Sequence, residues 1–177
     1  GTRSQLKIAP TTGTINFQDN YFRLAFSEYV DKRSVDESIF LSPDLGELEL
    51  DWSGTEVQIK FTDSLRANTT YVLTLGTDVK DLRNGNRMAE AFSLAFSTGD
   101  HIDSAAIAGK IFDAKPEGVM LFAYMLDNRN GDTLNPSHTK PDYLTQTGKD
   151  GTFLLPFLRL GNYRIISVRD EYKNLFY

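Results

Sequence analysis

The sequence contains no cysteine, and this absence excludes several classes of protein. None of its 177 residues carries a thiol, so disulfide cross-links, cysteine nucleophiles and cysteine-ligated zinc or iron–sulfur sites are ruled out. A small scaffold that depends on disulfides is therefore excluded. The compartment in which the protein works stays open, because many folds manage without disulfides.

Histidine, long apolar runs and excess positive charge are also scarce. The chain has two histidines, and the apolar run Val119–Met125 is far shorter than the roughly 20 residues that a membrane-spanning helix needs. The 19 Lys and Arg against 24 Asp and Glu give a formal net charge of −5. The basic residues are scattered rather than gathered into a stripe that would contact phosphates. We therefore predict a chain that neither spans a membrane nor binds nucleic acid.

The apolar residues that are present alternate with polar ones, as in half-buried strands. In Glu47–Trp52, three apolar side chains share one face and three carboxylates share the other. The alternation resumes in Val57–Phe61 after the turn at Ser53-Gly54, which predicts a hairpin. Further strands are expected at Tyr21–Phe26, Tyr71–Leu75 and Phe92–Ser97, and one helical turn at Val35–Ser38.

The strand pattern is interrupted at Thr98–Ser104, which we interpret as a boundary between domains 1–100 and 105–177. The segment is short and has no Gly-Ser repeat, so it is expected to restrict the orientations of the two domains. Strands are expected beyond it at Ile107–Phe112, Val119–Met125, Tyr143–Thr147, Thr152–Leu155 and Tyr163–Arg169, with an extended loop at Asp127–Asp142. Many short strands separated by turns predict an all-β fold with two tandem β-sandwich domains.

The first domain carries a series of short motifs in a fixed order. They are Ala9-Pro10, Gly13, Leu24–Asp31, Ser34-Val35, Leu65–Tyr71, Val79–Asp81, Asn84–Asn86 and Phe96–Gly99. Together they resemble the bacterial Ig-like domain family, which occurs in tandem on surface proteins and is also seen in S-layer proteins. Tyr71 follows a polar turn at the start of a strand, as the corner tyrosine of Ig-like sandwiches does. The resemblance implies a domain without catalytic activity.

The second domain carries a different set of motifs. They are Ala108–Ile111, Thr147–Phe153, Leu158 and Gly161–Ile165, with a tight hairpin turn at Asp150-Gly151. These segments resemble the prealbumin-like sandwich family, which includes carboxypeptidase regulatory-like and collagen-adhesin B-type repeats. Only five firm strands follow Ile107, with Leu175–Tyr177 as the expected start of a sixth, so this domain is expected to be truncated at Tyr177.

The pairing of an Ig-like with a prealbumin-like domain resembles surface lipoproteins of the Bacteroidetes type. This resemblance implies a location outside the cytoplasm, at the cell surface or envelope. It also implies a lipid anchor carried by a segment that is not in this sequence.

Catalytic constellations are not expected. His101 and His138 fall in the linker and the long loop, without the Gly-x-Ser-x-Gly turn of a serine hydrolase. A carboxylate pair for glycoside hydrolysis needs a cleft, which small sandwiches are not expected to supply. We therefore predict a protein that is not an enzyme and has no catalytic residue and no cofactor.

Two loops contain oxygen ligands of the kind that calcium prefers. The first offers Asp78, Asp81, Asn84 and Asn86, and the second is Asp127–Asp132. Asp, Asn and Gly are also the ordinary residues of turns, and turn formation is the favoured interpretation. No metal-binding residue is predicted, although calcium binding by the loop Asp78–Asn86 stays open.

An intramolecular isopeptide bond is a further hypothesis for the second domain. It would need Lys110, Asn174 and the acid Glu171. Lys110 lies on the opposite side of its strand from Ile111, whereas a reactive lysine must be buried to lose its proton. The favoured interpretation of Lys110 is a surface residue.

The leading functional hypothesis is a structural or adhesion module that acts as a spacer or display domain. The alternative is a glycan-binding module of a surface polysaccharide-binding or processing system, which two or three coplanar exposed rings would favour. Trp52 shares a face with Leu48 and Leu50 and is expected in the core. The aromatic residues expected to be free for binding are Tyr21, Tyr29, Tyr124, Tyr143 and Tyr172. The partners left open are surface proteins, glycans and the remaining domains of the same polypeptide.

Overall fold

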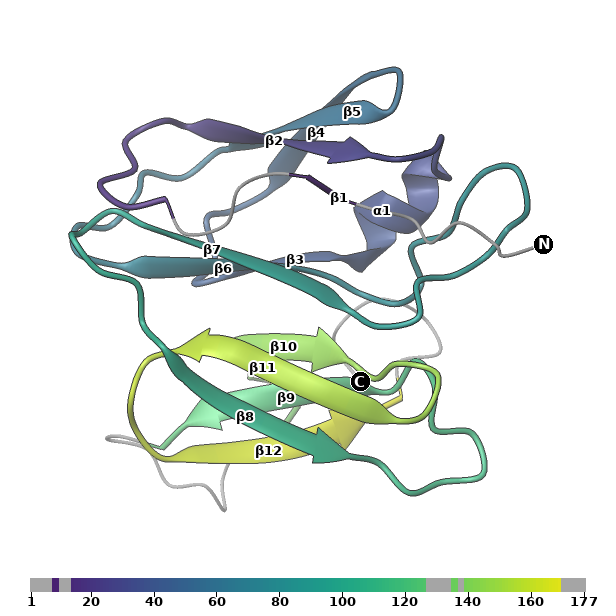
Figure 1. Ribbon diagram of the computed structural model, residues 1–177. Helices are drawn as coiled ribbons and strands as arrows, with labels where there is room; N and C mark the ends of the chain where they lie inside the picture. The colour runs from purple at the N-terminus through teal and green to yellow at the C-terminus, as the bar shows by residue number, and fades with distance from the viewer. Residues whose placement is uncertain (1–7, 10–13, 127–134, 137–138, 170–177) are drawn as a thin grey trace.

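The computed structural model describes residues 8–9, 14–126, 135–136 and 139–169, and its fold is all-β (Figure 1). The described elements are, in chain order, β1 (Ile8–Ala9), β2 (Tyr21–Phe26), α1 (Lys32–Ser38), β3 (Ile39–Ser42), β4 (Leu48–Ser53), β5 (Glu56–Phe61), β6 (Thr70–Leu75), β7 (Phe92–Ser97), β8 (Ala105–Lys110), β9 (Met120–Met125), β10 (Tyr143–Gln146), β11 (Thr152–Leu158) and β12 (Tyr163–Val168). Every ladder between these strands is antiparallel.

The first sandwich consists of sheet β1-β2-β5-β4 packed against sheet β3-β6-β7. Alternate residues of strands such as β2, β5 and β6 point inward, and side chains such as Leu24, Ile59 and Leu73 are completely buried between the two sheets. On the outer side of β4 and β5, Glu49 pairs with Lys60 across the ladder, and both are exposed. The alternation predicted for the hairpin is confirmed.

The second sandwich consists of sheet β10-β9-β12 and the two-stranded sheet β11-β8. Leu155 and Leu158 of β11 pack with Ala123 and Tyr143 from the opposite sheet. Figure 1 shows this sandwich below the first, with β10 and β11 on the side that faces sheet β3-β6-β7. Residues 105–168 thus build a separate pair of facing sheets.

Most predicted strands lie where the alternation placed them, with differences at their ends. β2 and β7 have the predicted bounds, whereas Ile107–Phe112 is replaced by Ala105–Lys110. Thr152, the first residue of β11, pairs with Lys110, so the ladder ends there and Phe112 is left 87% exposed. Strand β3 was not predicted. Most of the predicted loop Asp127–Asp142, and the predicted strand start at Leu175–Tyr177, lie outside the described residues.

The predicted helical turn is confirmed and begins earlier than expected. The Asp31 carboxylate accepts hydrogen bonds from the backbone N–H groups of Arg33 (3.1 Å) and Ser34 (3.3 Å), which caps the first turn of α1. Val35 on the inner side of the helix is completely buried. The helix therefore closes one end of the first sandwich.

Tyr71 makes the corner contact that its position predicted. Its ring is completely buried and stacks on Phe96 at a centroid distance of 5.4 Å. Its phenol oxygen accepts a hydrogen bond from the backbone N–H of Arg66, five residues upstream, at 2.8 Å. The side chain thereby fixes the turn that leads into β6, as the corner tyrosine of an Ig-like sandwich does.

Replacing Tyr71 with Phe tests the energetic importance of this contact. The Tyr71→Phe variant keeps the ring but leaves the Arg66 N–H without its acceptor, which should lower the free energy of unfolding by about 1–3 kcal/mol. Chemical denaturation measures the change. Tyr21→Phe, on the outer side of β2, is the control and should shift stability by less than about 0.5 kcal/mol. Equal losses in the two variants would contradict a special role for Tyr71.

Candidate functional site

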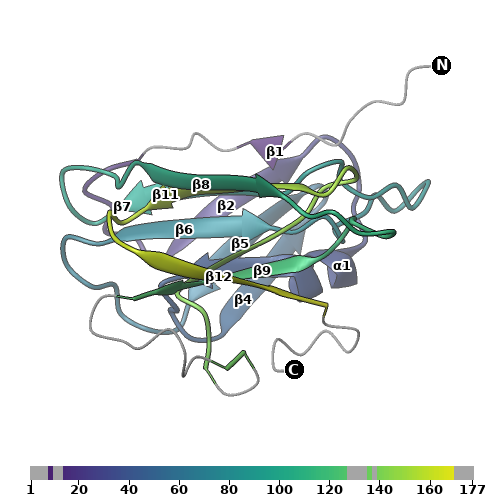
Figure 2. The same ribbon diagram turned by 90° about the horizontal axis from the view of Figure 1, so that it is seen from below.

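The two sandwiches meet on the outer face of sheet β3-β6-β7. Phe40 of β3 belongs to one apolar cluster with Met120, Phe122, Tyr124 and Val168. Val72 of β6 belongs to another, with Ala123, Tyr143, Leu155 and Leu158. These two clusters lie on opposite faces of sheet β10-β9-β12, so its edge strand β10 sits between Phe40 and Val72. In the view from below (Figure 2), β6 crosses the centre, with β8 and β11 to one side and β9 and β12 to the other.

Gln146 at the end of β10 provides the main polar contact between the sandwiches. Its side-chain Nε2 donates to Asp78 Oδ2 at 3.1 Å and to the carbonyl of Gly118 at 3.0 Å. Its Oε1 accepts from the backbone N–H of Asp78 at 3.4 Å. The residue is 3% exposed, and unpaired polar atoms are costly at such burial. The paired amide therefore specifies where the two sandwiches join.

A second set of contacts extends this joint along the chain after β10. Thr77 donates its hydroxyl to the carbonyl of Thr147 at 3.1 Å, and the N–H of Lys149 donates to the carbonyl of Ala89 at 3.2 Å. A Cβ added at Gly148 would lie 2.5 Å from that same Ala89 oxygen. The backbones of the two sandwiches approach so closely here that only glycine fits at position 148.

A polar cleft of about 650 Å³ lies beside the linker, between the sandwiches. Its lining includes three basic side chains, Arg66, Lys140 and Arg159, and three acidic ones, Asp44, Asp103 and Asp142. His101 also lines it, but hydrogen-bonds through Nδ1 to Asp100 Oδ1 at 3.0 Å, and no described hydroxyl bonds to its ring. Among the described residues of the cleft, the nucleophile–base contact of a serine hydrolase is therefore not formed at His101.

Asp100 and His101 form an exposed pair in which each residue shifts the pKa of the other. The hydrogen bond that the His101 ring donates to the Asp100 carboxylate raises the pKa of His101 above its ordinary value, and the same bond lowers the pKa of Asp100. Asp103 lies farther away, with its Oδ1 at 4.0 Å from Nε2. His138, the other histidine singled out by the sequence, lies outside the described residues.

The acidic residues of the loop Asp78–Asn86 form hydrogen bonds within the loop and with Gln146 across the joint. Asp81 is 4% exposed, and its carboxylate accepts from the backbone N–H groups of Asn84 and Asn86. Asp78 forms an ion pair with Arg87 at 3.5 Å besides its contacts with Gln146. Within the described ranges, no three His, Asp or Glu side chains gather closely enough to hold a metal ion. Residues 127–132 lie outside those ranges.

Of the hypothetical isopeptide residues, Lys110 alone falls in the described part of the chain. It is exposed on the outer side of β8, with its Nζ 5.6 Å from the centroid of the Phe112 ring. The interpretation of Lys110 as a surface residue is confirmed. Glu171 and Asn174 lie outside the described residues.

The aromatic residues that were expected to be free for binding are only partly so. Tyr29 is 61% exposed and Tyr21 is half-buried, but Tyr124 and Tyr143 are buried, which makes the prediction wrong for both. The Tyr124 hydroxyl donates to the carbonyl of Thr139 at 2.7 Å, and the Tyr143 ring packs between the two sheets of the second sandwich. Both faces of β9 and β10 are covered, so period-two alternation does not identify a solvent side. Tyr172 lies outside the described residues.

Trp52, the buried Tyr143 and the half-buried Tyr163 make packing contacts. Trp52 packs against the core of the first sandwich and stacks on Phe26 at 5.8 Å, as predicted. Tyr143 and Tyr163 make an edge contact at a centroid distance of 6.0 Å. Burial raises the pKa of both phenols above the ordinary tyrosine value. Tyr163 donates its hydroxyl to the carbonyl of Arg159.

Comparison with known proteins identifies the first sandwich most directly. A family model described as a bacterial Ig-like domain matches residues 5–98. No curated protein matches the chain. No helix of the described structure has the length and apolar character needed to cross a membrane.

Two solved structures show a weak likeness. An L,D-transpeptidase from Mycobacterium smegmatis is 16% identical and has a TM-score of 0.38. The superposition covers 83% of this chain and 74% of the transpeptidase chain. The N-terminal part of the bacterial S-layer protein SbsC is 15% identical and has a TM-score of 0.37. The superposition covers 86% of this chain and 43% of the SbsC chain. Both scores are too low to bear on function.

Two buried threonines near the joint should respond oppositely to removal of the hydroxyl. Thr147 Oγ1 accepts from the N–H of Val119 at 2.8 Å and donates to the carbonyl of Pro116 at 2.5 Å, whereas Thr145 Oγ1 has no hydrogen-bond partner in the described structure. Thr147→Val should lower the free energy of unfolding by about 2–3 kcal/mol, and Thr145→Val should leave it unchanged or raise it by about 1 kcal/mol. Denaturant unfolding measures both variants. A loss of similar size in Thr145→Val would show that its hydroxyl has a partner.

The Asp100–His101 pair has a measurable pH signature. Because Asp100 raises the pKa of His101 in the folded state, the pair favours folding at pH values below the ordinary histidine pKa, and this contribution disappears as the pH rises through the folded value. Asp100→Asn should return the pKa of His101 toward about 6.5, measured by NMR titration of the ring protons. Asp103→Asn, the matched control, should change that pKa less. A larger change from Asp103→Asn would contradict the assignment.

Proposed function

Because this chain belongs to the bacterial Ig-like domain family, we propose that it is a non-catalytic structural module of a bacterial cell-surface or secreted protein. In this proposal it acts as a rigid spacer or display element. The family match over residues 5–98 supports a structural surface-protein module. Its division into domains 1–100 and 105–177, a prealbumin-like second domain and lipid anchoring through another segment of the protein are further parts of the proposal.

The observation that carries the proposal is the joint between the sandwiches. A spacer holds a distance only if its units keep a fixed relative orientation, and contacts between the units restrict that orientation further than a short linker alone does. Here Phe40 and Val72 are buried between the sandwiches, and Gln146 bonds across the joint. The linker is also tied to the first sandwich, because the N–H of Asp103 donates to the Thr70 hydroxyl at 3.0 Å.

The glycan-binding alternative has less support from the described surface. Stacking on sugars needs neighbouring exposed rings, yet the most exposed aromatic side chains, Tyr29 and Phe112, belong to different sandwiches. The outer side of sheet β1-β2-β5-β4 carries Arg23, Asp51 and the Glu49–Lys60 pair, a solvated mixture of charges. The spacer hypothesis accounts for these features without a ligand.

Restricted orientation is the property to measure. Residual dipolar couplings from the two sandwiches should fit a single alignment tensor, and solution scattering should fit one arrangement of the two sandwiches. Phe40→Asp places a charge in the apolar joint and should separate the two tensors while each sandwich keeps its own dispersed spectrum. Leu82→Asp, at a side chain that is 65% exposed, should leave one tensor. Wild-type data that require a broad ensemble of orientations would refute the proposal, even if Phe40→Asp does not fold.

A further inference from the structure

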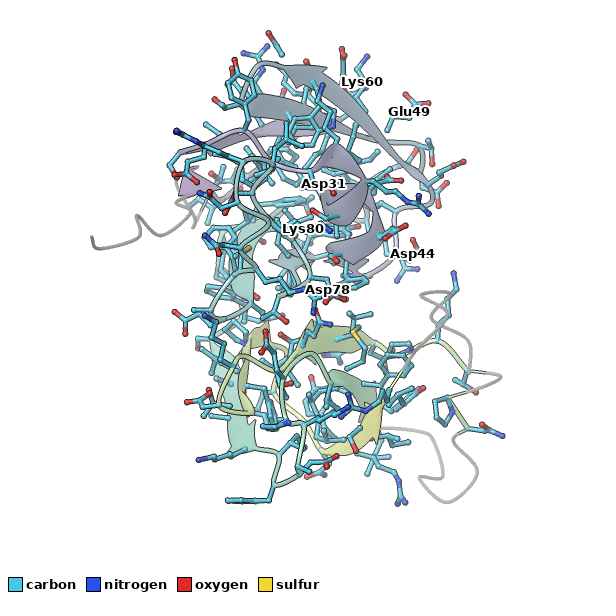
Figure 3. The ribbon with its side chains drawn as sticks, turned by 90° about the vertical axis from the view of Figure 1, so that its right-hand side faces the viewer. Asp31, Asp44, Glu49, Lys60, Asp78 and Lys80 are labelled. Carbon is cyan, nitrogen blue, oxygen red and sulfur yellow. The ribbon has the colours of Figure 1, made fainter. Side chains whose placement is uncertain are left out.

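A groove of about 440 Å³ runs along the outer edge of β3, where the two sandwiches meet. All four residues of β3, Ile39 to Ser42, line it, together with Leu48 at the start of β4 and with Lys140, Pro141, Asp142 and Leu144 of the second sandwich. In the described structure β3 pairs only with β6, so its other edge faces the groove. Figure 3 shows Asp44, which lines the groove, beside the boundary between the sandwiches.

The backbone of β3 presents hydrogen-bonding groups to this groove. Ser38 accepts a hydrogen bond from the N–H of Gly76 at 2.8 Å, and the pairing continues as Phe40 with Thr74 and Ser42 with Val72. In an antiparallel ladder, residues that bond to the partner strand alternate with residues whose N–H and C=O point away from it. The alternation turns the C=O of Ile39 and both backbone groups of Leu41 away from β6 and toward the groove, whereas the N–H of Ile39 completes the last turn of α1. An edge of this kind is a template for another strand.

The groove has apolar walls and an acidic rim. Ile39, Leu41 and Leu48 from the first sandwich and Leu144 from the second are half-buried along it.

The charged residues of the groove are the four carboxylates of Asp36, Asp44, Glu47 and Asp142 and the single ammonium of Lys140, which gives a formal charge of −3. Lys140 lies 3.6 Å from Asp44, and Asp142 accepts from the N–H of Met125 at 2.8 Å. Asp36 and Glu47 are exposed on the rim.

We propose that this groove binds an extended peptide segment in which basic and apolar residues alternate, as an added strand beside β3. The backbone of the peptide would pair with Ile39 and Leu41, its apolar side chains would pack against the leucine walls, and its Lys or Arg side chains would reach the acidic rim. At about 3.3 Å per residue, the four residues of β3 offer an edge roughly 13 Å long. This binding activity goes beyond the spacer function, which does not require it.

The first test uses a synthetic hexapeptide of alternating Lys and Val, blocked at both ends, titrated into the isotope-labelled full chain. We expect saturable NMR shifts of the Ile39 and Leu41 amides. The affinity of the peptide should fall as the salt concentration is raised, because salt screens the attraction between charges. A peptide of the same sequence with an N-methyl group on every residue, which cannot donate backbone hydrogen bonds along either edge, should not bind. Neither should an alternating Glu and Val peptide. Absence of binding at millimolar peptide, or shifts that map away from β3, would overturn the proposal.

The second test compares two double variants that each remove two exposed carboxylates. Asp36→Asn with Glu47→Gln changes the groove rim, and should raise the dissociation constant of the Lys–Val peptide about five- to tenfold. Glu49→Gln with Asp51→Asn removes the same charge from the outer side of β4, where Glu49 lies far from Asp44 (Figure 3), and should change it less than about twofold. Equal weakening in both variants would indicate attraction by net charge alone and would overturn the groove assignment. Residual dipolar couplings of the same samples test the spacer proposal independently. A single alignment tensor for both sandwiches supports that proposal whether or not the peptide binds.

Discussion

The structure depends on the burial of sheet β3-β6-β7 on both of its faces. All six residues of β6 are buried: Tyr71, Leu73 and Leu75 enter the core of the first sandwich, while Val72 packs against the second. A sheet covered on one side only would leave Phe40 and Val72 as an apolar patch in water. The covering also shields β10, an edge strand by its pairing, from association with other chains. One layer thus stabilises its own sandwich and positions the next.

Apolar and polar contacts contribute differently to this joint. Burial of side chains such as Phe40 and Val72 supplies roughly 1.5–3 kcal/mol each, but apolar surfaces tolerate small displacements. The bonds of Gln146 with Asp78 and Gly118 have strict geometry, and their loss in a displaced arrangement would leave buried polar groups unpaired. Because the linker already holds the sandwiches together, little further free energy is needed to favour one arrangement. A small joint is therefore sufficient.

Much of the fold follows from patterns within single strands. Alternation located β2, β7 and the hairpin of β4 and β5, and the polar turn before Tyr71 indicated its corner contact. Strand β3 was missed because Ile39 to Ser42 is uniformly apolar up to a final serine and follows α1 without a turn signal. The buried positions of Tyr124 and Tyr143 and the role of Gln146 depend on segments far apart in the sequence. A local pattern indicates which residues share a face, and does not indicate what covers that face.

The close approach at Gly148 also determines how sequences that keep this joint can diverge. The atom that excludes a side chain there is the carbonyl oxygen of Ala89, which every amino acid possesses, so no substitution at position 89 can make room. At Gly76 the obstructing atom is the side-chain oxygen of Gln146, and a change at one of these positions can be compensated at the other. Sequences that preserve the joint should therefore retain glycine at position 148, whereas a side chain at position 76 would require a smaller residue in place of Gln146 and so the loss of its bonds to Asp78 and Gly118. Such a substitution pattern would trace the inheritance of the joint independently of overall sequence identity.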